Sequence, residues 1–318
     1  MSDKREFSQR DLPRSPGAVS RRELMAGMAV TSVVAQAAQQ PKPAGTSPVA
    51  GLKGRLPQAQ IGDLKLSRMI LGGNQMGGWA HSRDLSYVEQ LCKAYYTKQK
   101  VFETLALAEQ CGINAFLTSN LLIPLVKAYW KTGGKIQFIS DNGSGPLLDA
   151  IGQSIDVGAC SCYIQGGVPD RLVQQGDFDQ ISKALELIRK SRIPAGIGAH
   201  KVETVTACVA KGLRPDYWMK TLHRTDYWSA KLEPQNDNIW DVRPEETVAC
   251  MQGLKEPWIA FKVLAAGAIA PKVGFRHAFD NGADFICVGM FDWQMVDDVN
   301  IALDVLAGAS KRARPWCA

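Results

Sequence analysis

The sequence predicts an α/β protein whose folded part is a single (β/α)8 barrel. Short apolar runs alternate with amphipathic stretches over about 250 residues, which is the typical size of such a barrel. Glycine repeatedly joins a helix to the next strand, as at Gly112, Gly212 and Gly282, which favours parallel strands. The alternative is a doubly wound sheet with GxGxxG after its first strand, but residues 72–78 (GGNQMGG) lack that spacing.

Each strand is expected where a short apolar run is bounded by turn residues, and each helix where apolar residues recur with helical spacing. Asp84 is a suitable N-cap, and Pro244 followed by two glutamates is typical of a helix start. Strands are expected at 68–73, 114–119, 135–140, 157–164, 194–199, 216–222, 258–264 and 284–289. Helices are expected at 101–111, 121–132, 146–153, 178–191, 202–211, 244–253, 274–281 and 295–307, with a further one at 84–97.

Residues 1–37 are expected to form a twin-arginine (Tat) export signal. Arg21 and Arg22 precede a weakly apolar run, and the segment Ala35-Gln36-Ala37 fits a small-x-small cleavage site. The alternative is a short amphipathic helix with a chance arginine pair. An export signal implies the Tat machinery as a partner and a periplasmic or other extracytoplasmic location.

Two further segments complete the expected organisation. Residues 38–60 are rich in Pro, Gln, Ala and Gly and are expected to be a flexible linker, which leaves residues 61–318 for the barrel. The apolar run near the N-terminus is too short and too rich in Ala and Gln for a stable membrane span.

The composition narrows the classes of partner. The 318 residues carry a net charge of +6, and the predicted signal holds part of that excess. No dense Lys/Arg stripe follows it, so nucleic acid is not an expected partner. Four of the eight cysteines (Cys111, Cys208, Cys250 and Cys287) lie in apolar patterns, which favours buried free thiols over a disulfide framework.

Function in such a barrel is expected at the carboxyl ends of the strands and in the loops that follow them. Polar and aromatic residues gather at these positions. The side chains expected to contact a small-molecule substrate are Asn74, Gln75, Trp79, His81, Tyr163, Gln165, Tyr227, Trp228, Trp240 and Asp292.

Three of the four histidines lie at predicted strand ends. His200 and His223 are candidates for acid/base catalysis near neutral pH. With Asp141 they are also candidate ligands of a divalent metal, although no HxH or HExxH spacing supports this. The alternative is that each imidazole only bonds to neighbouring loops.

Two lysines lie within apolar strands and are further catalytic candidates. The amines of Lys220 and Lys262 must lose their hydration, pair with an acidic group or extend to water. Loss of hydration lowers the pKa of a lysine, which suits it to act as a base or Schiff-base nucleophile. Pairing with Asp141 is the structural alternative. Strand periodicity puts Lys262 on the side of the strand opposite Phe261, so either Phe261 or Lys262 faces the helices.

The loop at about 223–243 is the longest predicted within the barrel. Its aromatic residues Tyr227, Trp228 and Trp240 are typical of a lid or substrate wall, and aromatic faces stack on sugar rings. The alternative is a loop packed over helices or in a subunit interface.

Residues 64–78 (LKLSRMILGGNQMGG) resemble the opening of aldo/keto reductases, and residues 102–116 resemble that family's first helix and second strand. The resemblance implies a TIM barrel with NADPH as hydride donor and a tetrad of Asp, Tyr, Lys and His on successive strand ends. Those positions differ here: the second strand ends in Thr118-Ser119-Asn120 and the third in Ser140-Asp141. Residues 265–268 and 288–290 are candidates for a small anion-binding rim.

The sequence therefore predicts an exported barrel enzyme that acts on a small carbonyl, polyol or sugar-like substrate. The expected chemistry is acid/base catalysis of the isomerase, epimerase or lyase type, with a lysine or a divalent ion stabilising an oxyanion. The alternatives are an NADP-dependent oxidoreductase with a displaced tetrad and a non-catalytic ligand-binding barrel.

Overall fold

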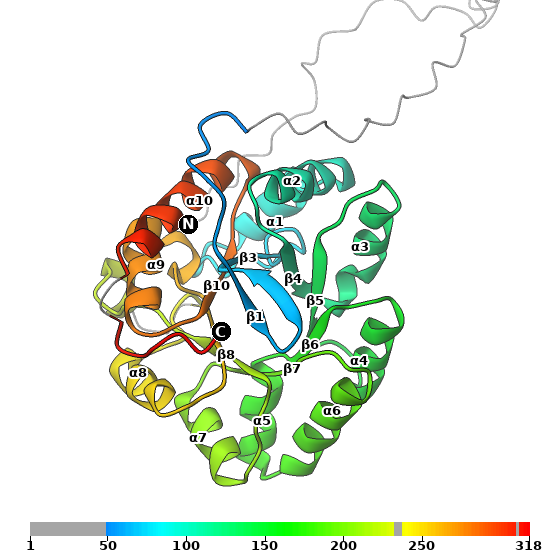
Figure 1. Ribbon diagram of the computed structural model, residues 1–318, viewed down its shortest axis with the longest axis vertical. Helices are drawn as coiled ribbons and strands as arrows, with labels where there is room; N and C mark the ends of the chain where they lie inside the picture. The colour runs from blue at the N-terminus through cyan, green and yellow to red at the C-terminus, as the bar shows by residue number, and fades with distance from the viewer. Residues whose placement is uncertain (1–48, 232–236, 310–311) are drawn as a thin grey trace, which may run out of the picture. The chain divides into compact units, whose positions relative to one another are not determined.

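Eight parallel strands close into a barrel in the computed structural model, which describes residues 49–231, 237–309 and 312–318. The strands pair in the order β10-β3-β4-β5-β6-β7-β8-β9, and β10 pairs with β3 to complete the circle (Figure 1). The predicted (β/α)8 fold is confirmed. The barrel strands are β3 (Met69–Gly72), β4 (Ala115–Ser119), β5 (Gln137–Asn142), β6 (Ser161–Ile164), β7 (Ala195–Ala199), β8 (Tyr217–Thr221), β9 (Trp258–Phe261) and β10 (Phe285–Gly289).

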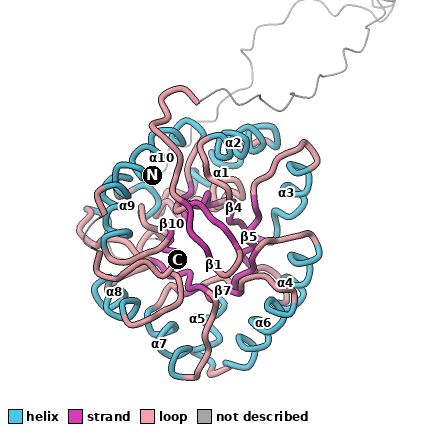
Figure 2. Tube along the Cα trace, in the orientation of Figure 1, coloured by secondary structure: helices cyan, strands magenta, loops and turns pink. Residues whose placement is uncertain are grey.

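Helices surround the strands, as Figure 2 shows with cyan helices outside the magenta barrel. The α-helices are α1 (Tyr87–Tyr95), α2 (Lys98–Gln110), α3 (Ile123–Trp130), α4 (Leu147–Asp156), α5 (Gly167–Gln175), α6 (Phe178–Lys190), α7 (Val202–Ala210), α8 (Pro244–Gln252), α9 (Pro271–Asp280) and α10 (Asp292–Ala307). Short 3-10 turns are η2 (Asn120–Leu122), η3 (Trp228–Lys231) and η4 (Ala265–Gly267). Helix α5, which begins at a Gly-Gly pair, is not among the helices expected from the sequence.

The barrel strands are buried on both faces, so alternate residues enter two separate cores. In β5, Phe138 packs outward against the helices and Ile139 packs into the barrel. Because side chains alternate along a strand, Asp141 lies on the inner face, two residues beyond Ile139. The same alternation puts Tyr163 inside the barrel, where it packs in the inner core.

An antiparallel hairpin, β1 (Gln58–Ile61) with β2 (Leu64–Ser67), leads into the first barrel strand. Ala59, Ile61 and Leu66 pack in the inner core, and the hairpin lies across the centre of the barrel in Figure 1. Strand β1 begins within residues 38–60, which were predicted to be a linker. Its buried and exposed residues alternate, which is the pattern of a half-buried strand. The predicted signal, residues 1–37, and residues 38–48 of the predicted linker lie outside the described residues.

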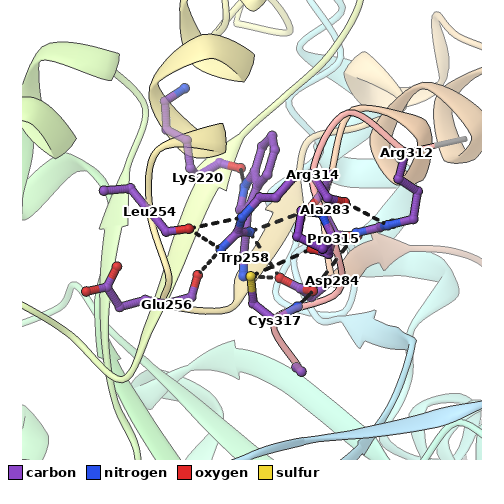
Figure 3. Close-up of polar contacts among 12 residues, drawn as sticks. Lys220, Leu254, Glu256, Trp258, Ala283, Asp284, Arg312, Arg314, Pro315 and Cys317 are labelled. Carbon is purple, nitrogen blue, oxygen red and sulfur yellow. Dashed lines mark hydrogen bonds and ion pairs between the residues drawn. The ribbon is translucent and has the colours of Figure 1, made fainter.

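The segment 312–318 binds the amino ends of β9 and β10 (Figure 3). The guanidinium of Arg314 is 3.1 Å from the Asp284 carboxylate and also donates to the carbonyl of Leu254. The same carboxylate accepts backbone N–H bonds from Trp258 at 2.9 Å and from Cys317 at 2.8 Å. Arg314 and Asp284 are both fully buried, so this cluster fixes the end of the barrel opposite the strand carboxyl ends.

Within the described part of the chain, no helix is both long enough and apolar enough to cross a membrane. All eight cysteines are free thiols, and Cys111, Cys208 and Cys287 are buried. Burial raises the pKa of each of these three thiols to about 11 or 12, so each is protonated at neutral pH.

Candidate active site

A carboxyl and a phenol lie inside the barrel near the carboxyl ends of β5 and β6. The hydroxyl of Tyr163 donates a hydrogen bond of 2.7 Å to the Oδ2 of Asp141. Burial raises the pKa of Asp141 to about 6, although the bond from Tyr163 and the charge of Lys262 act in the opposite direction. Gly196 makes room for this pair, because a Cβ there would lie 2.7 Å from the Cβ of Tyr163. The carboxyl of Asp141 can therefore hold or release a proton near neutral pH.

His200 follows β7 and is held by Asp170 of helix α5. The Nδ1 of His200 lies 3.0 Å from the Asp170 Oδ2, and the backbone N–H of His200 donates to the same oxygen at 3.1 Å. Thr204 donates to the other carboxylate oxygen at 2.6 Å. Gly166 lets the ring approach the backbone, since a Cβ there would meet the Cε1 of His200 at 2.9 Å.

The protonation states of this pair follow from their contacts. Burial raises the pKa of Asp170, but the hydrogen bonds from His200 and Thr204 outweigh it and hold the pKa below its ordinary value. Burial lowers the pKa of His200, and the charge of Lys262 lowers it further, despite the bond to Asp170. A neutral imidazole with its proton on Nδ1 leaves Nε2 as a free base, and no described residue hydrogen-bonds to that nitrogen.

Lys262 comes directly after β9 and has a φ of +58°. Strict strand periodicity places this side chain opposite Phe261, on the helix side. The strand ends at Phe261, and the left-handed backbone of Lys262 turns its amine to the face of the Trp240 indole, 4.2 Å from the ring centroid. Burial lowers the pKa of Lys262 to about 7, against the opposing charges of Asp237 and Asp141.

The indole of Trp240 is the point at which the predicted site residues meet. Its ring centroid lies 4.5 Å from that of His200 and 6.0 Å from that of His81, in addition to its contact with Lys262. Burial lowers the pKa of His81 to about 4, with smaller contributions from Lys262 and His200. These four side chains and the pair Asp141–Tyr163 form a group that we call the mouth cluster.

His223 lies outside the mouth cluster and anchors the loop that carries Trp240. Its Nδ1 donates to the carbonyl of Arg224 at 2.8 Å, and its Nε2 accepts the backbone N–H groups of Trp240 and Asp241, both at 2.9 Å. Burial lowers the pKa of His223 to about 4. Both ring nitrogens are thus occupied by backbone groups, which leaves neither for a substrate proton or a metal.

Lys220 points to the helix side of β8, as do its strand neighbours Trp218 and Leu222. Its Nζ donates to the carbonyl and the hydroxyl of Thr221 at 2.9 and 2.8 Å and lies 3.8 Å from a carboxylate oxygen of Asp241. In Figure 3 this amine points away from the Asp284 cluster. Burial lowers the pKa of Lys220 to about 8. Of the two predicted lysines, only Lys262 belongs to the mouth cluster.

The remaining predicted residues are distributed around the cluster. Gln165 is near Asp141, since a Cβ on Gly143 would lie 2.8 Å from Gln165 and 3.3 Å from the Asp141 Oδ1. The Oε1 of Gln75 is buried and has no hydrogen-bond partner within the described chain. Asn74 is exposed, and Trp79 packs over Gly77.

Three predicted residues have contacts away from the cluster. Tyr227 packs with Ala265 and Ile269. Trp228 is 72% exposed, with Arg83 over its ring. Asp292 begins α10 and binds Tyr95 and Lys100.

The residues present do not fit the predicted metal site. No group of three His, Cys, Asp or Glu side chains in the described ranges is arranged to hold a metal ion. His223 is occupied by backbone groups, as described above, so it does not complete a set with His200 and Asp141. A hollow of about 750 Å³ lies instead at the opposite end, lined by residues that include Asp63, Arg192 and Glu256.

Comparison with known proteins identifies the fold. No protein-family model and no curated protein matches the chain. Among solved structures, a Pseudomonas aeruginosa protein provisionally described as an aldo-keto reductase is 17% identical, with a TM-score of 0.53 over 80% of this chain and 99% of that one. A truncated 3-deoxy-D-arabino-heptulosonate 7-phosphate synthase from Thermotoga maritima is 12% identical, with a TM-score of 0.50 over 81% of this chain and 95% of that one. The shared feature is the TIM-barrel fold, on which enzymes of different chemistry are built.

Proposed function

We propose that this protein is an enzyme that transfers protons on a small carbonyl or polyol compound of sugar-like character. The observation that carries the proposal is the convergence of His200 and Lys262 on one indole, that of Trp240, with the Asp141–Tyr163 pair interacting electrostatically with Lys262. Isomerases, epimerases and lyases that work through an enolate begin by removing a proton from the carbon next to a carbonyl.

Each member of the cluster has a role in such a reaction. The free Nε2 of His200 removes the proton, while Asp170 fixes the imidazole in the required tautomer. Lys262, which is partly protonated at neutral pH, stabilises the negative charge that develops on the substrate oxygen. The Asp141–Tyr163 pair supplies or accepts the second proton. No step passes through a metal ion.

The substrate class follows from the same residues. A half-buried indole beside hydrogen-bonding groups suits a ligand with an apolar ring face and several hydroxyl groups. The Trp240 ring offers that face, and Tyr163, Lys262 and His81 offer polar atoms around it.

The direct test is solvent exchange. Purified protein is incubated in deuterated water with a panel of aldoses, ketoses and 2-oxo acids, and loss of the α-proton signal is followed by NMR. We expect exchange with at least one compound and a loss of roughly 100-fold or more in His200→Gln. His277→Gln is the matched control, because this histidine lies on α9 outside the cluster. Equal exchange in His200→Gln and the unmutated protein would refute the proposal.

A second candidate function is NADP-dependent carbonyl reduction. The observation that favours it is the presence of Asp141, Tyr163, Lys262 and His200 in one mouth, the same four residue types as the reductase tetrad. Here they come from β5, β6 and the segments after β9 and β7, so the tetrad is displaced. Fluorescence titration with NADPH tests this function, and micromolar binding with carbonyl-dependent oxidation would establish it in place of proton transfer.

The first part of the predicted anion rim, residues 265–268, does not fit a cofactor phosphate. In the turn at 265–268, the N–H groups of Ala265, Gly267 and Ala268 already donate to carbonyls within residues 262–265. The roles given above therefore use only the side chains of this chain. A barrel that binds its ligand without catalysis would show saturable sugar binding and no exchange for any member of the panel.

We also propose that the protein is exported through the twin-arginine pathway. The proposal is supported by the order of Arg21-Arg22, apolar run and Ala35-Gln36-Ala37 in the sequence. Replacement of both arginines by lysine is expected to retain the protein in the cytoplasm, as measured by fractionation. Undiminished export of that variant would count against this route.

A further inference from the structure

We propose that Lys262 is a nucleophile that forms an imine with the carbonyl carbon of the substrate, with the Asp141–Tyr163 pair exchanging the protons that this step needs. The inference rests on the proposed function and deepens it. It replaces electrostatic activation of the carbonyl by covalent activation at the same site.

The Lys262 amine is free of polar partners. Within the described chain, its Nζ makes no hydrogen bond and no ion pair, and it lies over the face of Trp240. Lys220, the fully buried lysine of β8, is different, because it is bound by Thr221 and paired with Asp241. A lysine that served only the fold would be expected to have such partners.

The surroundings of that amine favour its neutral form. It is half-buried against an indole, where the charged form loses hydration, and its pKa falls to about 7. About half of the molecules then carry a neutral amine at neutral pH, whereas an ordinary lysine, with a pKa of about 10.4, is almost wholly protonated. A lone pair is therefore available at Nζ for attack.

An acid–base pair accompanies the Lys262 amine. Asp141 and Lys262 interact electrostatically, and Asp141 accepts the phenol proton of Tyr163 at 2.7 Å. The carboxyl has a pKa of about 6, so it exchanges protons in the same pH range as the amine. Imine formation needs both a proton donor and an acceptor beside the reacting carbon.

The step balances as follows. The lone pair of Nζ attacks the carbonyl carbon, a C–N bond forms, and the oxygen takes a proton through Tyr163. The nitrogen loses a proton to Asp141, the hydroxyl is protonated and leaves as water, and the C=N bond forms. One amine, one carbonyl and one proton give one iminium ion and one water, with no change in oxidation state. The iminium then acidifies the adjacent C–H, which the Nε2 of His200 removes.

Reductive trapping tests the inference. The full chain is treated briefly with dihydroxyacetone and sodium borohydride, and the labelled lysine is located by peptide mass mapping. We expect label at Lys262 at least about tenfold faster than at the exposed Lys127 and Lys183, because Lys262 has a large neutral fraction at pH 7. The rate at Lys262 should rise with pH around a midpoint near 7. Label at Lys262 no faster than at Lys127 would overturn the proposal.

Two variants separate this inference from the proposed function. Lys262→Arg keeps the positive charge and cannot form an imine, so it should lose both the label and the solvent exchange. If Lys262→Arg retains exchange, the imine is refuted and electrostatic proton transfer stands. If Lys262 in the unmutated chain is labelled and no compound exchanges, the proposed proton transfer is refuted and the imine stands. Tyr163→Phe keeps the ring and should slow labelling, which a structural role alone would not do.

Discussion

Asp170 on α5 holds His200 through two bonds to one carboxylate oxygen, one from the imidazole Nδ1 at 3.0 Å and one from the backbone N–H at 3.1 Å. The same oxygen therefore fixes the position of the residue and the tautomer of its ring. The carbonyl of His200 is held in turn by the hydroxyl of Thr221 at 2.9 Å. His200 is the most firmly oriented base in the mouth cluster.

We expect Asp170→Asn to reduce proton exchange by roughly 100-fold. An amide can donate to Nδ1 and so favour the wrong imidazole tautomer, and it does not stabilise the positive charge that forms when the ring takes a proton. The measurement is the exchange rate, together with the ring nitrogen shifts of His200 by NMR. Asp149→Asn, at an exposed position on α4, is the matched control and should leave the rate unchanged. A variant Asp170→Asn with full activity would remove Asp170 from the catalytic assembly.

Lys262→Met is expected to change the pH dependence of stability. The folded pKa of about 7 lies below the unfolded value, so between pH 7 and about 10.4 the unfolded chain binds more protons and the unmutated protein gains stability as pH rises. Below pH 7 the full cost of burying the ammonium is present. Lys262→Met should therefore be more stabilising at pH 6 than at pH 10, by roughly 3–5 kcal/mol at most. Urea unfolding at both pH values measures this, and an equal difference would contradict it.

His223→Phe should destabilise the protein by roughly 2–5 kcal/mol, because the backbone N–H groups of Trp240 and Asp241 lose their acceptor. Exchange of these two amide protons should become faster, which NMR measures directly. Displacement of the Trp240 indole should also lower activity.

The same histidine is expected to affect how the free energy of unfolding depends on pH in the acidic range. Its folded pKa of about 4 lies below the unfolded value of about 6.5. The unfolded chain binds the extra proton in this window, so stability is lost as pH falls from 6.5 to 4. His223→Phe removes that contribution, and its curve should be flatter there than that of the unmutated protein. Parallel curves would show that His223 is not neutral in the fold.

Arg314→Met should lower the free energy of unfolding by about 3–5 kcal/mol, since it leaves the Asp284 carboxylate buried without its 3.1 Å partner. Activity at temperatures where the variant is folded should be unchanged, because this pair lies at the end of the barrel opposite the mouth cluster. Thermal unfolding measures the effect. Arg276→Met on the exposed side of α9 is the control, with an expected change within about 0.5 kcal/mol.

The fold was predictable from sequence because each barrel strand is buried on both faces and appears as a short apolar run. The strand ranges were placed within a few residues for the same reason. The hairpin β1–β2 was not predicted, because Gln58 and Gln60 are exposed and its composition is that of a linker. Helix α5 was also missed, since Gly167 and Pro169 interrupt the helical pattern, and Asp170 was missed with it.

The candidate site was predictable in composition but not in pairing. His200, Lys262, Asp141, Tyr163 and Trp240 were all identified as strand-end or loop residues. Periodicity alone did not show that Lys220 faces the helices and that Lys262 faces the mouth. The direction of Lys262 is decided by its own backbone torsion φ, directly after β9. Nor does a sequence show that His223 is bonded to amides 17 and 18 residues further on.

The left-handed backbone at Lys262 sets the catalytic role proposed for this residue against the stability of the fold. A residue with a Cβ in this conformation costs roughly 1–2 kcal/mol compared with glycine, and here the side chain also loses its hydration. Random substitutions selected only for thermal resistance should therefore accumulate at position 262, with glycine or asparagine favoured. When selection for activity is imposed as well, lysine should be retained at position 262.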